Sequence, residues 1–90
     1  MRNKNTGIIT NNKRVERIIN IVEDHYEVNT KLKTRERSVL IPRQIAMYVI
    51  YKNVNISLEK IGIHYSRTHA TVLNAIRMVQ DILDSKSRSD

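Results

Sequence analysis

Basic side chains gather in one short stretch of the chain. Residues 31–43 hold five Lys or Arg against a single Glu. Guanidinium and ammonium groups at this density bind phosphate groups, so the stretch points to a polyanion, with nucleic acid first. The alternative is that these charges only solvate an exposed face, as charge runs often do. The basic residues concerned are Lys31, Lys33, Arg35, Arg37 and Arg43.

No combination of residues predicts catalysis or a metal site. The chain has no cysteine, which excludes disulfides, thiol catalysis and cysteine-ligated zinc. Its histidines, His25, His64 and His69, lack the spacing of zinc-binding motifs. There is also no Gly-rich phosphate loop and no Ser-His-Asp arrangement. We therefore expect no enzyme activity, no cofactor, no metal and no bound nucleotide.

Length and composition limit the chain to one small domain. Its 90 residues carry 16 Lys and Arg against 9 Asp and Glu, a net charge of +7, and 40% are hydrophobic. The longest apolar run, Ile45–Tyr51, is far shorter than the ~20 residues that span a bilayer, and the first residues lack a secretory signal. Only 4% of residues are aromatic, which argues against stacking on single-stranded bases. These features predict a cytoplasmic, nucleoid-associated protein without a membrane partner.

The hydrophobic pattern has helical period before and after the basic stretch. One apolar stripe predicts an amphipathic helix over residues 13–26. A short helix or turn is expected near Asn29–Lys33. Because proline suits a first turn and disrupts a helix interior, a further helix is predicted to start at Pro42 and to run to about Asn53. The first stripe consists of Val15, Ile18, Ile19, Val22 and Tyr26.

Two further helices follow in close succession. Ser57 predicts the N-cap of a short helix over Leu58–Tyr65, and a turn near residue 66 leads to a last helix capped by Thr68. This arrangement matches a helix-turn-helix, whose second helix enters the DNA major groove; the alternative is a plain helical hairpin within a bundle. We predict an all-α domain of four or five helices. The last helix is expected to face inward with Val72, Ala75, Ile76, Val79, Ile82 and Leu83.

Three motifs, in this order, resemble the C-terminal DNA-binding domain (domain IV) of the bacterial replication initiator DnaA. In that family a basic loop precedes P-R-Q-I-A-M-Y, which stands here at residues 42–48. S-L-E-K-I-G at 57–62 is similar to the family's S-L-P-E-I-G, and R-T-H-A-T-V-L at 67–73 is similar to its R-D-H-T-T-V-L. The resemblance runs from about Val15 to Leu83 and implies a helix-turn-helix of the TrpR-like type. We expect this domain over residues 13–84, with flexible tails over 1–12 and 85–90.

The resemblance also implies roles for residues within these motifs, with double-stranded DNA as the partner. An arginine of the family's basic loop enters the minor groove. By alignment to Pro42 that arginine is Arg35 here, with Lys33 and Arg37 flanking it. Contacts to bases in the major groove map to Thr68, His69 and Ala70. Phosphate contacts are implied for Arg43 and Gln44, and we add Arg67 and Thr71.

The chain departs from the family pattern where the target sequence is decided. Ser66 stands in place of paired glycines in the turn, and Glu59 in place of a proline. Thr68 replaces an aspartate, which can accept a hydrogen bond from a cytosine amino group. Ala70 replaces a threonine, so the methyl group is kept and the hydroxyl is lost. The ATPase motif G-x-x-x-x-G-K-[ST] is also absent, so the chain is not expected to hydrolyse ATP. We expect binding at replication origins or regulatory sites, but with an altered target sequence.

Two other functions stay open. The fold is a candidate protein-interaction module that binds a replication or transcription protein, and the weakened base-reading set at Thr68 and Ala70 is its support. A basic RNA-associated protein is the third and weakest alternative.

Overall fold

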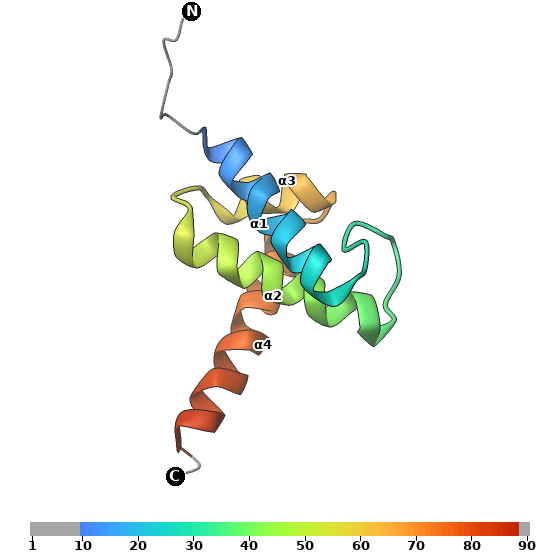
Figure 1. Cartoon of the computed structure of the whole chain (residues 1–90). Coiled ribbons are helices and arrows are strands. Elements are labelled where there is room, and N and C mark those ends of the chain that lie inside the picture. The colour runs from blue at the N-terminus through green and yellow to red at the C-terminus, as the bar shows by residue number, and fades with distance from the viewer. Residues whose placement is uncertain (1–9, 89–90) are drawn as a thin grey trace, which may run out of the picture.

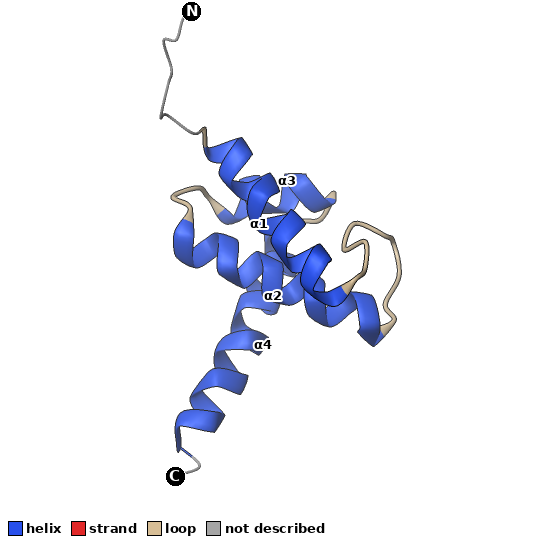
Figure 2. Cartoon of the chain, viewed as in Figure 1, coloured by secondary structure: helices blue, strands red, loops and turns tan. Residues whose placement is uncertain are grey.

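The computed structural model describes residues 10–88, which form helices joined by short loops (Figure 2). These are α1 (Asn11–Tyr26), α2 (Arg37–Asn53), α3 (Leu58–Tyr65) and α4 (His69–Arg88). No strand occurs within residues 10–88, so the predicted all-α fold is confirmed, and the segment near Asn29–Lys33 forms a turn. Parts of the predicted tails, residues 1–9 and 89–90, lie outside the described residues.

A single hydrophobic core joins the helices. α2 packs against α1, α3 and α4, and α1 runs across it in Figure 1. Each helix contributes apolar side chains that are buried, which is the main favourable term in folding. The core consists of Val15, Ile19, Val22, Ala46, Met47, Ile50, Val54, Ile61, Tyr65, Val72, Ala75 and Ile76.

The ends of α1 are fixed by local backbone chemistry. The helix begins at Asn11, slightly before the predicted position, because the Thr10 hydroxyl oxygen accepts a hydrogen bond from the Lys13 N–H (3.2 Å) and so caps the first turn. It ends at Tyr26, after which Glu27 takes the left-handed conformation (φ 57°). The chain then leaves the helix axis and enters the segment 27–36, which we call the basic loop.

The start of α2 corrects a prediction. The helix begins at Arg37, before Pro42, and its first turn is closed by the Val39 N–H, which donates to the Glu36 carbonyl (3.0 Å). Pro42 has no N–H to offer the carbonyl of Ser38 one turn earlier. Ser38 is exposed, whereas Val39 and Pro42 are buried. The rule against an interior proline is overridden here because one lost hydrogen bond is offset by packing.

The turn between α3 and α4 confirms the predicted helix-turn-helix. Ser57 caps α3 by accepting from the Lys60 N–H (3.2 Å). After α3, Ser66 is left-handed (φ 55°), and the Arg67 N–H donates to the Gly62 carbonyl (2.9 Å). The backbone therefore returns closely over Gly62, where an added Cβ would lie 2.3 Å from the Arg67 carbonyl oxygen. Only glycine fits at this position.

The C-terminal half of α4 corrects a second prediction. Val72, Ala75 and Ile76 face the core, but Ile82 and Leu83 are 56% and 43% exposed. The helix continues to Arg88, past the boundary expected at residue 84, and Figure 1 shows this half running away from the other helices. The apolar period therefore extends beyond the core that could bury it. None of the helices within residues 10–88 is both long and apolar enough to cross a membrane.

We predict that Gly62→Ala destabilises the domain by about 2 kcal/mol or more, because the new methyl group forces the backbone of the turn to move. Urea denaturation followed by circular dichroism measures this change. An alanine variant as stable as the wild type would contradict the close approach seen at the turn.

The neighbouring Ser66→Gly substitution is the matched control. It removes a Cβ from a left-handed residue, and we expect it to stabilise the domain by roughly 1 kcal/mol. Opposite signs for the two substitutions distinguish the geometry of this turn from a general sensitivity to mutation.

Candidate nucleic-acid interface

The fold places the basic loop beside the start of α4. Between them lies a hollow of about 550 Å³, lined by residues of the loop, of α2 and of the α3–α4 junction. Four lining residues are cations and none is a carboxylate, so the hollow favours an anion. Site residues predicted from motifs far apart in the sequence meet here. The lining residues are Lys33, Thr34, Arg35, Leu40, Arg43, Arg67 and Thr71.

The start of α4 presents an exposed polar surface. Thr68, His69, Ala70 and Thr71 are all exposed. The Thr68 hydroxyl oxygen accepts from the Thr71 N–H (3.4 Å), which is the N-cap predicted for it. Arg67, just before the helix, is half-buried and donates from Nη1 to the carbonyl of Tyr65 (3.1 Å). The helix thus begins with a row of exposed side chains, preceded by an arginine that is bonded to the backbone of α3.

Arg43 corrects a third prediction. The sequence predicts that it binds a phosphate, but only 4% of the residue is exposed. Its guanidinium donates to three carbonyls of the basic loop, from Nε to Thr30 (2.8 Å) and from Nη2 to Leu32 and Thr34 (3.2 Å for Thr34). Burial and the charge of Arg67 lower the pKa of Arg43. Arg43 therefore holds the loop in shape rather than standing ready for a phosphate.

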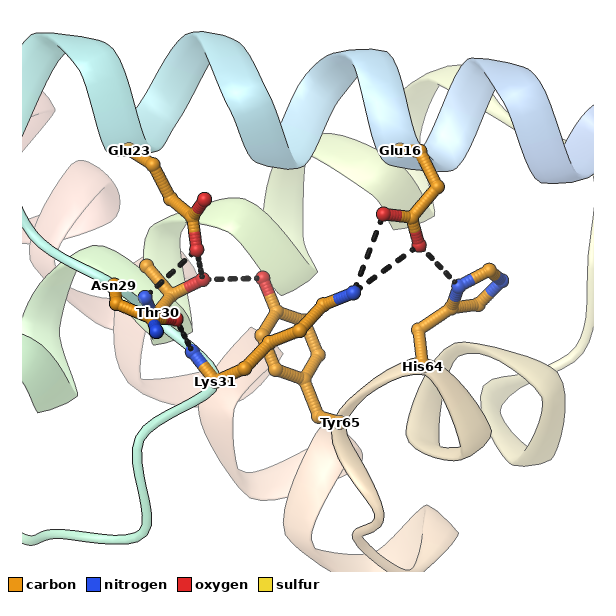
Figure 3. A network of polar contacts seen from close by, with 7 residues as sticks. All are labelled: Glu16, Glu23, Asn29, Thr30, Lys31, His64 and Tyr65. Atoms are coloured by element: carbon orange, nitrogen blue, oxygen red, sulfur yellow. Dashed lines mark hydrogen bonds and ion pairs between the residues drawn. The ribbon is translucent and has the colours of Figure 1, made fainter.

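Thr30 connects the basic loop to two other parts of the fold (Figure 3). It is fully buried, and both its N–H and its hydroxyl lie 2.8 Å from Oε2 of Glu23 on α1. The same hydroxyl lies 3.1 Å from the hydroxyl of Tyr65, the last residue of α3. Burial, with Glu23 and Glu16 nearby, raises the pKa of Tyr65 to about 12, so the phenol keeps its proton near neutral pH.

Glu16 makes a second connection between α1 and these elements. Its carboxylate accepts from the Lys31 ammonium (3.2 Å) and lies 2.8 Å from Nδ1 of His64 on α3 (Figure 3). Burial raises the pKa of Glu16, but the hydrogen bonds and charges of His64 and Lys31 outweigh it, so the net shift is downward. The ion pair is half-exposed, and it uses Lys31 within the fold rather than in the hollow.

Two of the predicted site residues lie elsewhere. Gln44 donates to the sulfur of Met78 on α4 (3.5 Å), and Arg37 opens α2. Both line an apolar groove of about 390 Å³ between α2 and the C-terminal half of α4, not the hollow. They therefore do not line the hollow that Lys33 and Arg35 line. Within residues 10–88, no group of three or more His, Cys, Asp or Glu is placed to hold a metal ion.

The sequence patterns did not identify Glu23, Thr30 or Tyr65 as members of a polar network. Glu23 lies on a helix with other acidic residues, and Thr30 lies in a loop without periodicity. Their importance comes from contacts across 7 and 35 positions, which no local pattern encodes. The one available signal was Tyr65 itself, since a buried tyrosine hydroxyl usually finds a partner.

We predict that Arg43→Lys lowers the free energy of unfolding by about 1–3 kcal/mol, because one ammonium cannot reach three carbonyls that diverge around a planar guanidinium. Chemical denaturation gives the value. Arg37→Lys, at an exposed position, is the control and should change stability little. Equal stability of the two variants would contradict the clamping role of Arg43.

Acid titration tests the Glu16 contacts. Because its folded-state pKa is lowered, Glu16 stabilises the fold above its ordinary pKa of 4.5, and this contribution is lost as pH falls through the folded value. We expect Glu16→Gln to be less stable than the wild type by under about 1 kcal/mol near neutral pH and low salt. The difference should vanish in acid. A difference that persists at low pH would contradict this assignment.

Comparison with known proteins now places the chain in a family. The family model described as "Bacterial dnaA protein helix-turn-helix" matches residues 15–79. The chain is 40% identical over 72 residues to the chromosomal replication initiator protein DnaA of Bdellovibrio bacteriovorus, which covers 76% of this chain. It is 35% identical over 79 residues to the DnaA of Brucella abortus (83% of the chain) and 39% identical over 72 residues to that of Thermus thermophilus (76%).

The matched region is a small part of these relatives, 15–16% of their length. No solved structure matches the chain. The match nevertheless spans the basic loop, the helix-turn-helix and the hollow between them. The resemblance read from the three motifs is confirmed, and the chain belongs to the family of bacterial DnaA helix-turn-helix domains.

Proposed function

We propose that this chain binds double-stranded DNA with a preference for sequence. The start of α4 enters the major groove, and the basic loop reaches the neighbouring minor groove. The observation that carries this proposal is the hollow between the two elements, which is lined by Lys33, Arg35 and Arg67 beside the inward-turned Arg43 and has no carboxylate among its lining residues. A sugar-phosphate strand separates the two grooves of a duplex, and a basic hollow between two groove-reading elements suits that strand.

The individual roles follow from position and chemistry. Arg35 and Lys33 are exposed on the loop. The strong negative potential of a narrow A·T-rich minor groove attracts an arginine in such a position. Arg67 and Thr71 line the hollow and are suited to phosphates. Contacts to base edges fall to the exposed Thr68, His69 and Ala70. Arg37 and Gln44 have weaker support as DNA contacts because they lie at the apolar groove.

The relatives named above are replication initiators, which supports a role at replication origins or at regulatory sites recognised by similar domains. Such a role would place the protein in the cytoplasm with the nucleoid. Thr68 and Ala70 differ from the family motif, so we expect a target sequence shifted from that of the relatives.

Selection from random duplex DNA tests the proposal most directly. It reports binding and the preferred site in one experiment. If about 4–6 phosphates are contacted, log affinity should fall against log salt with a slope of roughly −4 to −5. A slope near zero on random duplex would contradict the proposal.

We predict that Arg35→Ala weakens binding to the selected site by ~1–3 kcal/mol and binding to random duplex by less. On the selected site the variant loses a groove contact, whereas on random duplex it loses only electrostatic attraction to phosphates. The control is Arg17→Ala, which removes an exposed cation from α1, outside the hollow. Competition gel-shift assays on both duplexes give the two affinities. Equal losses on both would reduce Arg35 to a plain phosphate contact.

The alternative function is binding to a replication or transcription protein. Its specific support is the apolar groove between α2 and α4, where Met78, Ile82 and Leu83 are exposed. A chain that fails to shift duplex DNA even at low salt, while its Ile82→Ser variant loses binding to a purified protein partner, would favour it.

A further inference from the structure

The anchor of the basic loop is a buried polar side chain with every polar group in use. Thr30 is fully buried, its N–H and hydroxyl bond to Glu23, and its carbonyl accepts from Arg43. Tyr65 completes the set from α3. We call Glu23, Thr30, Arg43 and Tyr65 the loop clasp. The four residues come from α1, the loop, α2 and α3, so the clasp joins these four elements.

The directions of these hydrogen bonds follow from the number of protons. The Thr30 hydroxyl has a single proton, and it donates that proton to Oε2 of Glu23. The Tyr65 hydroxyl therefore has to donate to the Thr30 oxygen at 3.1 Å. Removing the Tyr65 hydroxyl breaks this last bond alone and leaves the Thr30–Glu23 bonds in place.

Tyr65 also lies next to the turn that sets the direction of α4. It is the last residue of α3, and its carbonyl accepts a hydrogen bond from Arg67, which lies two residues before α4. Lys33 and Arg35 follow shortly after Thr30 on the other side. Tyr65 thus connects the loop, through its hydroxyl, to Arg67, through its carbonyl, just before α4 begins at His69.

We propose that Thr30 and Tyr65 are positioning residues. They fix the separation between the basic loop and the start of α4, and so set sequence preference without touching DNA. This inference rests on the proposed DNA binding. A loop already held in its bound shape loses less conformational entropy on binding, which favours the one duplex geometry that fits both elements. A loosened loop keeps its charges and continues to bind phosphates on any sequence.

Tyr65→Phe is the decisive variant, and Tyr48→Phe is its matched control. Tyr48 also donates a hydrogen bond from a partly buried hydroxyl, but its acceptor is Gln80 on α4 (3.2 Å) rather than a residue of the loop. For Tyr65→Phe we expect about fivefold weaker binding to the selected duplex, the effect of one neutral hydrogen bond. We expect unchanged binding to random duplex and an unchanged salt slope. Tyr48→Phe should bind both duplexes like the wild type.

A second measurement keeps the inference testable apart from DNA. Amide hydrogen exchange of residues 31–36 in the free protein should be faster in Tyr65→Phe than in Tyr48→Phe, because only the former loosens the loop. Thr30→Val, which removes the same hydroxyl network, should speed exchange at least as much.

The outcomes separate the inference from the function on which it rests. A wild type that binds no duplex would refute the proposed DNA binding. The exchange experiment would still test whether the Tyr65 hydroxyl holds the loop, because it uses the free protein. Loop exchange in Tyr65→Phe equal to that in Tyr48→Phe would overturn the clasp. So would equal losses of affinity on selected and random duplex, because they would reveal a general loss of binding rather than a loss of positioning.

Discussion

The buried guanidinium of Arg43 is the interaction on which the shape of this surface depends. Its donors satisfy three backbone carbonyls of a loop that has no helix or strand to satisfy them. A buried cation is costly unless it is fully hydrogen-bonded, and the planar fork of arginine suits several acceptors at once. With its carbonyls turned toward Arg43, the loop is a fixed element that directs Lys33 and Arg35 into the hollow.

The same arrangement divides the basic residues into two kinds. Arg43 and Lys31 are used within the fold, one on loop carbonyls and the other on Glu16. Lys33, Arg35 and Arg67 line a hollow that has no carboxylate among its lining residues. Like charges gathered in this way repel one another, which disfavours the compact state unless an anion is bound. The density of charge thus matches a role in holding a phosphate backbone, and the buried arginine provides the frame for it.

Much of the fold followed from the sequence, because helical period and capping residues are local. The caps at Ser57 and Thr68, the helix-turn-helix and most of the stripe in α1 were predictable in this way. Tyr26, the last member of that stripe, is the exception, because it is 41% exposed. Three features were not. Packing around Pro42 overrides its preference for a first turn; Ile82 and Leu83 keep the apolar period of α4 but lie beyond the core; and Arg43 has the same residue type as the arginines around it. Which of several basic residues turns inward is decided by carbonyls that only the folded loop brings together.

We propose that the basic loop and the start of α4 act on DNA as one surface. Titration of the isotopically labelled chain with a selected duplex, followed by amide chemical shifts, tests it most directly. We expect residues 31–36 and 67–72 to shift together, with the same dependence on DNA concentration, while the amides around Met78 and Ile82 stay unchanged. Shifts confined to one of the two elements, or centred on the groove between α2 and α4, would contradict it.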